Sequence, residues 1–439
     1  MSPWPTGSPT GPDPKTPSGR YRPTGTRRSN AGLLLGHLHR YGPRSRTDLV
    51  AETGLSKASV TSLVGDLVAR DLLVECDVTH TGHSGRPSRP VDISGRWVEG
   101  IGIEITERTA TGFAINLSGD LVAERSAPFA PAEGEDIDRA PGDVAQAIAR
   151  VASDLLDAAL DRGHVVAGLC LAVPAHLCRR AQPIRSPGWG PEVMAVLEQL
   201  TTTRCGPGVD VRADRSADLA AVAERRLGPQ GEAATLVTID GGAAVGGGVV
   251  LDGGAARGAT GLVADVGHLV VAPDGERCWC GGRGCWETVV GVEAIVRQCC
   301  PDLAGNPLTL RSPAVIAEVA RRARIGDAFA LEGLERVGRW VGIGLASIVA
   351  TLNPHAVVLD GSFRLLGPWL LDHAMAAFAA HAGGPALDDC FVTTSSLDGT
   401  APRRGAAMRA VAHVVDDPES ILEAASSVCN GRAAGSSQR

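Results

Sequence analysis

The spacing of hydrophobic residues predicts three short helices between residues 29 and 70. Ser56 is a good N-cap for the third helix, whose hydrophobic side chains then fall at positions i, i+3, i+4, i+7 and i+8 of one face. Ser45 caps the second helix in the same way, with Asp48 three residues on. Gly54 lies in the short turn between the two, where it can adopt the left-handed conformation. The stripe on the third helix comprises Val60, Leu63, Val64, Leu67 and Val68.

Two helices joined by a tight glycine turn are typical of a helix-turn-helix unit, and the outer face of the third helix is polar. The residues after this helix predict a β-hairpin wing with two arginines at its tip. We therefore predict a mostly α-helical winged helix-turn-helix domain over residues 29–95, which binds double-stranded DNA. The alternative is a three-helix module for protein contacts, which leaves the basic wing unexplained. The candidate DNA contacts are Lys57, Thr61, Ser62, Arg86 and Arg89.

From about residue 96 the pattern changes to short β-branched runs that alternate with helical segments. This alternation favours an α/β domain, which we predict over residues 96–415. Residues 1–28 contain seven prolines and few hydrophobic residues, so we predict a disordered tail, followed at the other end by a flexible tail over residues 416–439. We expect a helix at 144–159 and strands at 98–105, 111–117, 165–173, 235–239, 247–251 and 356–359.

The charge distribution divides the chain at the same place. Residues 1–96 hold 13 Lys and Arg against 8 Asp and Glu, a net charge of +5, whereas the remainder holds 29 against 41, a net charge of −12. A basic front and an acidic body favour a nucleic-acid module joined to a second domain. The first 28 residues lack an apolar signal region, and the longest apolar stretch, 340–352, is too short to span a bilayer. We therefore expect a cytoplasmic protein with reduced cysteines and no membrane partner.

One histidine and three cysteines have the spacing of a metal site. Their number and type match the four ligands of tetrahedral zinc, and three glycines between the last two cysteines let the chain turn back on itself. Because protein ligands would fill all four positions, we predict that Zn²⁺ has a structural role. The alternative is a set of free thiols in a glycine-rich loop. The candidate ligands are His268, Cys278, Cys280 and Cys285.

This segment resembles the signature of the ROK family (repressors, open reading frames and sugar kinases), which joins an acidic-x-Gly-His unit to Cys-x-Cys-Gly-x-x-Gly-Cys-x-Glu. Residues 265–268 and 278–287 follow that pattern, with Asp265 in place of the usual glutamate. The resemblance covers nearly the whole chain, because Gly85-Arg86-Pro87 after the predicted helix-turn-helix and residues 341–361 also resemble family segments. It implies a two-lobed, actin-like (ribonuclease H-like) α/β domain with structural zinc. The residues that it implies for sugar binding are Asp265, His268 and Glu287.

The resemblance also predicts that the domain is not a kinase. Family kinases carry Asp-x-Gly-Gly-Thr in the first strand turn, where this chain has residues 104–109 without a glycine pair. They also carry Asn-Asp-Ala-Asn before a helix, and here Ser216 stands at the position of the aspartate that acts as the base. Asp214 could replace that base only in a shifted register. The glycine cluster at 241–248 survives, but without its partners it predicts tight packing rather than a phosphate site. We predict no catalytic residues.

Two family asparagines that contact the sugar are replaced, by Arg215 and by Ser186. Arg215 would either favour a phosphorylated or acidic ligand or pair with Asp214 or Asp218, and the sequence leaves both open. We expect a transcriptional regulator, a repressor of carbohydrate-related genes, that responds to a sugar or sugar-derived ligand. It would bind a palindromic operator as a homodimer or tetramer. The alternatives are an ATP-dependent sugar kinase with a DNA-binding head, and a regulator that has lost sugar binding.

Overall fold

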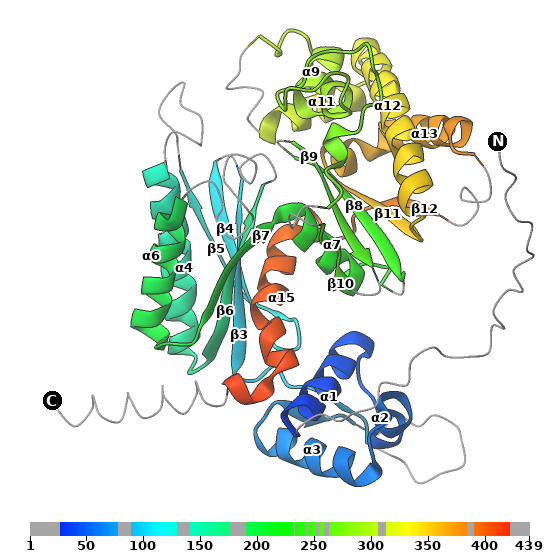
Figure 1. The fold of residues 1–439 in the computed structure, drawn as a ribbon. Coiled ribbons are helices and arrows are strands. Elements are labelled where there is room, and N and C mark those ends of the chain that lie inside the picture. The colour runs from blue at the N-terminus through cyan, green and yellow to red at the C-terminus, as the bar shows by residue number, and fades with distance from the viewer. Residues whose placement is uncertain are drawn as a thin grey trace, which may run out of the picture.

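The chain forms a small head and two α/β lobes in the computed structural model (Figure 1). The predicted tails fall outside the described residues except for 27–28 and 416–421, and Arg86 and Ser186 also fall outside them. The structure describes residues 27–77, 89–106, 108–129, 141–174, 190–231, 233–242, 244–251, 254–258, 263–305, 313–383 and 390–421.

The head contains the three helices that the hydrophobic pattern predicts, at α1 (Arg27–Tyr41), α2 (Arg46–Thr53) and α3 (Lys57–Ala69). Ser45 and Asp48 form a capping box at the start of α2, since each side chain accepts a hydrogen bond from the backbone of the other. Gly54 ends α2 at a φ of 72°, in the left-handed region. The strands β1 (Leu73–Glu75) and β2 (Val91–Ile93) pair antiparallel, as the predicted wing requires.

The first lobe is built on a five-stranded sheet of order β5-β4-β3-β6-β7. Helices α4 (Pro141–Asp161) and α6 (Gly190–Cys205) cover one face of the sheet, and α15 (Ala401–Asp416) lies against the other (Figure 1). The strands are β3 (Val98–Ile105), β4 (Thr109–Asn116), β5 (Leu121–Pro128), β6 (Val165–Val173) and β7 (Asp210–Arg215).

The second lobe has a sheet of order β10-β9-β8-β11-β12, in which β8, β11 and β12 run parallel. One face packs against helices to form the largest hydrophobic cluster, and α7 (Ser216–Leu227) packs on β8 and β9 and on α15, between the two lobes. The strands are β8 (Thr235–Gly241), β9 (Val245–Leu251), β10 (Gly254–Ala255), β11 (Ala356–Gly361) and β12 (Phe391–Thr394). The helices are η2 (Val266–His268), α8 (Glu287–Val290), α9 (Val292–Cys299), α11 (Pro313–Arg324), α12 (Ala328–Leu352) and α13 (Ser362–His381). Although α12 has 25 residues, no helix in the described ranges is long and apolar enough to cross a membrane.

The sequence pattern failed to predict four strands, and all four are edge strands: β5, β7, β10 and β12. An edge strand has a neighbour on one side only, and it tolerates polar residues because water covers much of it. β7, for example, contains four charged residues among six, so its composition is that of a loop.

The head and the first lobe share one hydrophobic cluster. Leu34, Leu35 and Leu38 of α1 are buried in the same cluster as the last turns of α15. Backbone also meets backbone there, because a Cβ on Gly32 would overlap the carbonyl oxygen of Asp416. The residues that α15 contributes are Val411, Val414 and Val415. The head is therefore packed directly on the lobe.

Candidate functional site

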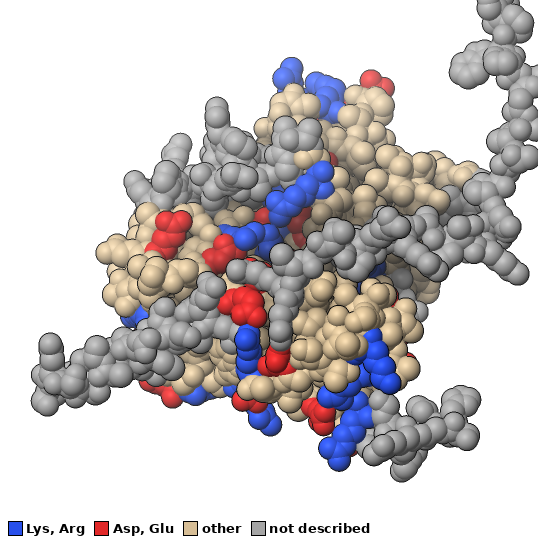
Figure 2. Space-filling view, turned by 60° about the horizontal axis from the view of Figure 1, so that its bottom comes forward, with Lys and Arg blue, Asp and Glu red and all other residues tan. Residues whose placement is uncertain are grey.

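The outer face of α3 presents polar side chains at the start of the helix. Lys57, Thr61 and Ser62 are exposed, while the hydrophobic stripe of the same helix is buried in the head. Thr61 Oγ1 donates to the backbone carbonyl oxygen of Lys57 at 2.8 Å, one helical turn earlier. Figure 2 turns the head toward the viewer and shows Lys and Arg mixed with Asp and Glu on this side. The three predicted DNA contacts on α3 thus share one accessible face.

The fourth described candidate, Arg89, lies at the base of the wing. The strand ladder ends at Glu75 and Val91, and Cys76 donates to the carbonyl oxygen of Pro90 at 2.9 Å. Arg89 therefore lies directly beside the ladder, two residues before β2, and the predicted tip of the hairpin lies outside the described residues. Its guanidinium lies 3.7 Å from the Glu75 carboxylate, whose pKa is lowered, chiefly by the hydrogen bond from Arg46.

A second basic group on the head did not stand out in the sequence. Arg40 and Arg44 lie 5.4 and 5.9 Å from the ring centre of Tyr41, a residue that is 48% exposed. Glu52 accepts from His37 Nε2 at 2.5 Å and from Arg44 Nε at 3.1 Å. These residues come from the end of α1, from the turn after it and from α2. The one signal for this group in the sequence was the short spacing of basic residues between positions 37 and 44.

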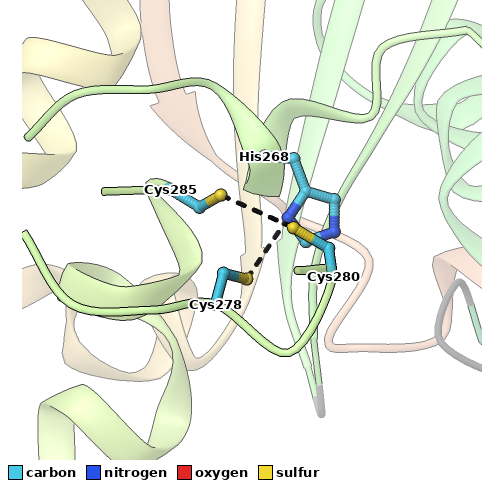
Figure 3. Close-up of side chains that lie close together, drawn as sticks. All are labelled: His268, Cys278, Cys280 and Cys285. Atoms are coloured by element: carbon cyan, nitrogen blue, oxygen red, sulfur yellow. Dashed lines mark hydrogen bonds between the residues drawn. The ribbon is translucent and has the colours of Figure 1, made fainter. Parts of the chain in front are cut away.

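The predicted metal ligands come together as one cluster (Figure 3). Their ligand atoms all lie within 4.8 Å of one another, and the cluster is made by His268 from η2 and by Cys278, Cys280 and Cys285 from the loop before α8. Gly284, at a φ of 70°, packs its Cα against the Ala272 carbonyl, where a Cβ would overlap the oxygen. The glycine is thus required for the turn that returns Cys285 to the cluster.

The distances suit a tetrahedral ion. Zn–S bonds of about 2.3 Å and Zn–N bonds of about 2.0 Å place two sulfurs about 3.8 Å apart, and a sulfur and a nitrogen about 3.5 Å apart. Cys280 Sγ and Cys285 Sγ are 3.7 Å apart, and Cys278 Sγ lies 3.5 Å from His268 Nδ1. These two distances match the values for a tetrahedral zinc site, and the cluster could therefore hold a metal ion.

The three residues predicted to hold a sugar surround the η2 turn. Asp265 precedes the turn, and its carbonyl oxygen accepts from His268 N at 3.0 Å. Glu287 begins α8, and its Oε2 accepts from Val245 N at 2.6 Å. A Cβ on Gly267 would lie 3.0 Å from this oxygen, so the carboxylate is close to the backbone of the turn.

Arg215 is held by backbone groups of the second lobe. Its side chain is 2% exposed and donates to the carbonyl oxygens of Val263 at 2.8 Å and Gly247 at 3.0 Å. Asp218 Oδ1 lies 3.8 Å from the same guanidinium, and burial raises the pKa of this carboxyl to about 6. Asp214 instead pairs with Arg257 at 3.1 Å.

Three carboxylates meet where the lobes face each other, and the sequence did not predict this group. Asp240 and Asp360 are partners in register on β8 and β11, and Glu104 comes from β3 of the first lobe. Burial, followed by the charges of Asp360 and Glu104, raises the pKa of Asp240 to about 7. Arg403 of α15 pairs with Glu104 at 2.7 Å. The available signal was two hydrophobic strands that each end in Asp-Gly.

Comparison with known protein families supports both parts of the chain. The model of the ROK family matches residues 101–412. The chain belongs to the ROK family. The model of the MarR family matches residues 26–84 of this ROK protein, which include the helices of the head and the first strand of the wing. The predicted family membership is thus confirmed.

Several ROK regulators match across both parts. The DNA-binding transcriptional dual regulator NagC of Escherichia coli (strain K12) is 25% identical over 83% of this chain and 84% of its own length. The xylose repressor of Bacillus subtilis (strain 168) is 22% identical over 90% of this chain and 97% of its own. A solved ROK family transcriptional regulator, described as a homolog of the E. coli MLC protein, has a TM-score of 0.70 at 22% identity and covers 91% of this chain and 99% of its own. The predicted winged-helix head joined to an actin-like ROK fold is therefore confirmed.

A ROK kinase matches a smaller part of the chain. The glucokinase of Streptomyces griseus, solved with glucose and AMPPNP, is 25% identical with a TM-score of 0.54. It covers 98% of its own length but 70% of this chain. The kinase fold thus corresponds to the two lobes, whereas the regulators also match the head.

Proposed function

We propose that this protein is a sequence-specific DNA-binding transcriptional regulator, a repressor of carbohydrate-related genes, whose ROK domain binds a sugar or sugar-derived ligand. The observation that carries the proposal is the exposed polar start of α3, in a winged-helix head that packs directly on the sugar-kinase-like lobes. Repressors among its relatives match over the same two parts. The domain division at residues 29–95 and 96–415, a cytoplasmic location and assembly as a homodimer or tetramer belong to this proposal.

Lys57, Thr61 and Ser62 are the proposed readers of base edges in the major groove, since short polar side chains and lysine suit these contacts. Arg89 and Arg86 would contact the phosphate backbone, which fixes the register of the head. Two heads of a dimer would meet half-sites about one helical turn, or a multiple of it, apart. The operator is therefore a palindrome.

The cluster of His268, Cys278, Cys280 and Cys285 is the proposed site of Zn²⁺, because its ligand types and distances suit a tetrahedral ion. When bound, the ion would cross-link η2 to the loop before α8 and would supply no open coordination position. Asp265 and Glu287 would accept hydrogen bonds from sugar hydroxyl groups, and His268 would contribute its second ring nitrogen. Arg215 is the fourth proposed residue of this site. It holds the segments that carry the other residues in place by donating hydrogen bonds to the carbonyl oxygens of Val263 and Gly247.

The absence of sugar phosphorylation is also part of the proposal. Ser216 is buried at the start of α7, and a neutral hydroxyl is a poor general base. Glu104, Asp240 and Asp360 lie where the resemblance to ROK kinases puts the triphosphate, and any of these carboxylates that is ionised would repel the phosphates of ATP. We expect no ATP turnover with hexoses, either from the wild type or from Ser216→Asp. Turnover by the wild type would favour the alternative of a kinase with a DNA-binding head, whereas turnover in Ser216→Asp alone would show that Ser216 is what disables the site.

The test is selection of genomic fragments by the purified protein. A Lys57→Ala/Thr61→Ala/Ser62→Ala variant would run beside the wild type at one salt concentration, with Arg150→Ala/Asp154→Ala on the exposed face of α4 as the matched control. Enrichment of a few palindromic sites by the wild type and the control, lost in the α3 variant, is the expected result. Equal enrichment by all three proteins would refute the assignment of α3.

Thermal unfolding in the presence of neutral, amino and phosphorylated sugars tests the ligand site. A ligand that binds only the folded protein stabilises it by RT ln(1 + [L]/Kd), so the unfolding temperature rises with ligand concentration and with affinity. We expect a shift that Asp265→Asn and Glu287→Gln abolish. Absence of a shift with every sugar, combined with intact operator selection, would instead support a regulator that has lost sugar binding.

A further inference from the structure

Arg215 stands at the junction between the proposed ligand site and α7. It is the last residue of β7 and the N-cap of α7, so its backbone begins the helix. Its guanidinium reaches the second lobe and donates to two carbonyl oxygens there. Both acceptors belong to segments that carry proposed ligand residues. Val263 lies two residues before Asp265, and Gly247 lies on β9, two residues after the Val245 amide that holds Glu287.

α7 connects this junction to α15 through close backbone contact. A Cβ on Gly405 of α15 would overlap the carbonyl oxygen of Leu219 in α7, so the two helices touch without an intervening side chain. The other side of α7 touches β9 in the same way, because a Cβ on Gly248 would overlap the Ala217 carbonyl oxygen. No flexible side chain lies at either crossing to absorb a shift of the helix.

α15 also contacts the DNA-binding head. It runs along the first lobe and ends against α1 (Figure 1), where its last turns share the buried cluster with the leucines of α1. The contact between Gly32 and the Asp416 carbonyl again joins backbone to backbone. A continuous series of packed elements therefore leads from the ligand loop through Arg215, α7 and α15 to α1.

We propose that Arg215 is a positioning residue that couples occupancy of the ligand site to the orientation of the DNA-binding head, through α7 and α15. This inference rests on the proposed function for its biological meaning. A ligand that draws Asp265, His268 and Glu287 together moves the carbonyl groups that Arg215 holds, and the guanidinium transfers this shift to the start of α7. The two-state element is the pair α7 and α15, and the ligand changes the population of its two positions.

The test is hydrogen exchange of the full-length protein, compared between the wild type and Arg215→Met. Arg204→Met is the control, because Arg204 lies on α6, on the face of the first sheet opposite α15, and pairs with Asp157 of α4 at 2.8 Å. We expect Arg215→Met to change exchange in residues 263–268, in α7 and α15 and in α1, by roughly 2- to 30-fold at α1. A change confined to residues 263–268 and β9, or the same change at α1 in Arg204→Met, would overturn the proposal.

Two further variants cover a failure of Arg215→Met to fold. Arg215→Lys keeps the charge and can reach one of the carbonyls, so an intermediate change at α1 is expected. Gly405→Ala pushes α15 away from α7, and it should therefore change exchange in α1. Unchanged α1 exchange in Gly405→Ala would refute the route through α15.

Operator binding separates this proposal from the proposed function. We expect Arg215→Met to bind a selected palindromic fragment with a Kd that differs from the wild-type value by roughly 2- to 30-fold, with partial rescue in Arg215→Lys. An unchanged Kd would refute the coupling while leaving the regulator assignment intact. If the wild type selects no DNA, the proposed function fails, and the exchange measurements still decide whether Arg215 communicates with the head.

Discussion

Replacing Asp240 by asparagine should stabilise the protein above neutral pH. The pKa of this carboxyl is about 7 in the folded protein, because of burial and the neighbouring carboxylates, against an ordinary value of 3.8. The difference of about 3 units, at about 1.4 kcal/mol per unit, corresponds to at most about 4 kcal/mol. The residue keeps some contact with solvent, so we expect about 2 kcal/mol. The asparagine is isosteric, and it can still accept the hydrogen bond that Gly242 donates.

The raised pKa of Asp240 makes the free energy of unfolding depend on pH. Between about pH 4 and pH 7 the folded protein holds a proton on Asp240 that the unfolded chain has released, so the free energy of unfolding falls as pH rises through this window. The asparagine variant lacks that slope. Urea unfolding at pH 4.5 and pH 8 should therefore show little difference from the wild type at the lower pH and the full gain at the higher one.

An exposed carboxylate serves as the control, since Asp154→Asn on α4 should change stability little at either pH. A loss of stability in Asp240→Asn at pH 8 would refute the reasoning, because it would mean that the ionised carboxylate is held by favourable partners. It would also remove the electrostatic objection to a bound triphosphate at this place.

Three further changes test separate features of the structure. Glu99→Gln removes the charge of a fully buried carboxylate that accepts two hydrogen bonds from Arg162 and contacts His164. It should lower the free energy of unfolding in urea by roughly 3 kcal/mol, and a decrease of less than about 1 kcal/mol would contradict this expectation. Gly54→Ala should lower head stability by about 1 kcal/mol through its left-handed backbone alone, since no atom lies within 4 Å of the added methyl group, whereas Gly65→Ala within α3 should not destabilise the head. Cys280→Ser should lower both the zinc content measured by mass spectrometry and the unfolding temperature. Cys390→Ser, outside the cluster, should keep both, and equal zinc in the two variants would argue against the metal site.

The elements that could be predicted from sequence are those whose signals are local. Ser45, Ser56 and Gly54 marked the helix boundaries of the head, because capping and left-handed turns depend on a few neighbouring residues. The central strands were visible as β-branched runs buried on both faces. β5 and β7 were not visible, because strands at a sheet edge carry exposed and charged residues.

The same distinction applies to the candidate site. The metal cluster was predictable because its four ligands lie within 18 residues of one another, with glycines at the turn. The group of Glu104, Asp240 and Asp360 required knowledge of which strands meet, since each residue comes from a different strand. The partners of Arg215 are backbone carbonyls 32 and 48 residues away, and a backbone acceptor leaves no mark in the sequence.

The position of α15 in the chain affects how the protein is made. The helix completes the packing of the head and of the first lobe, whose remaining elements all precede residue 216. A ribosome synthesises residues 216–400 before this helix exists. The leucines of α1 and one face of the sheet that contains β3 and β6 therefore stay uncovered until α15 has been made. A chain interrupted within the second lobe therefore carries an incompletely packed head.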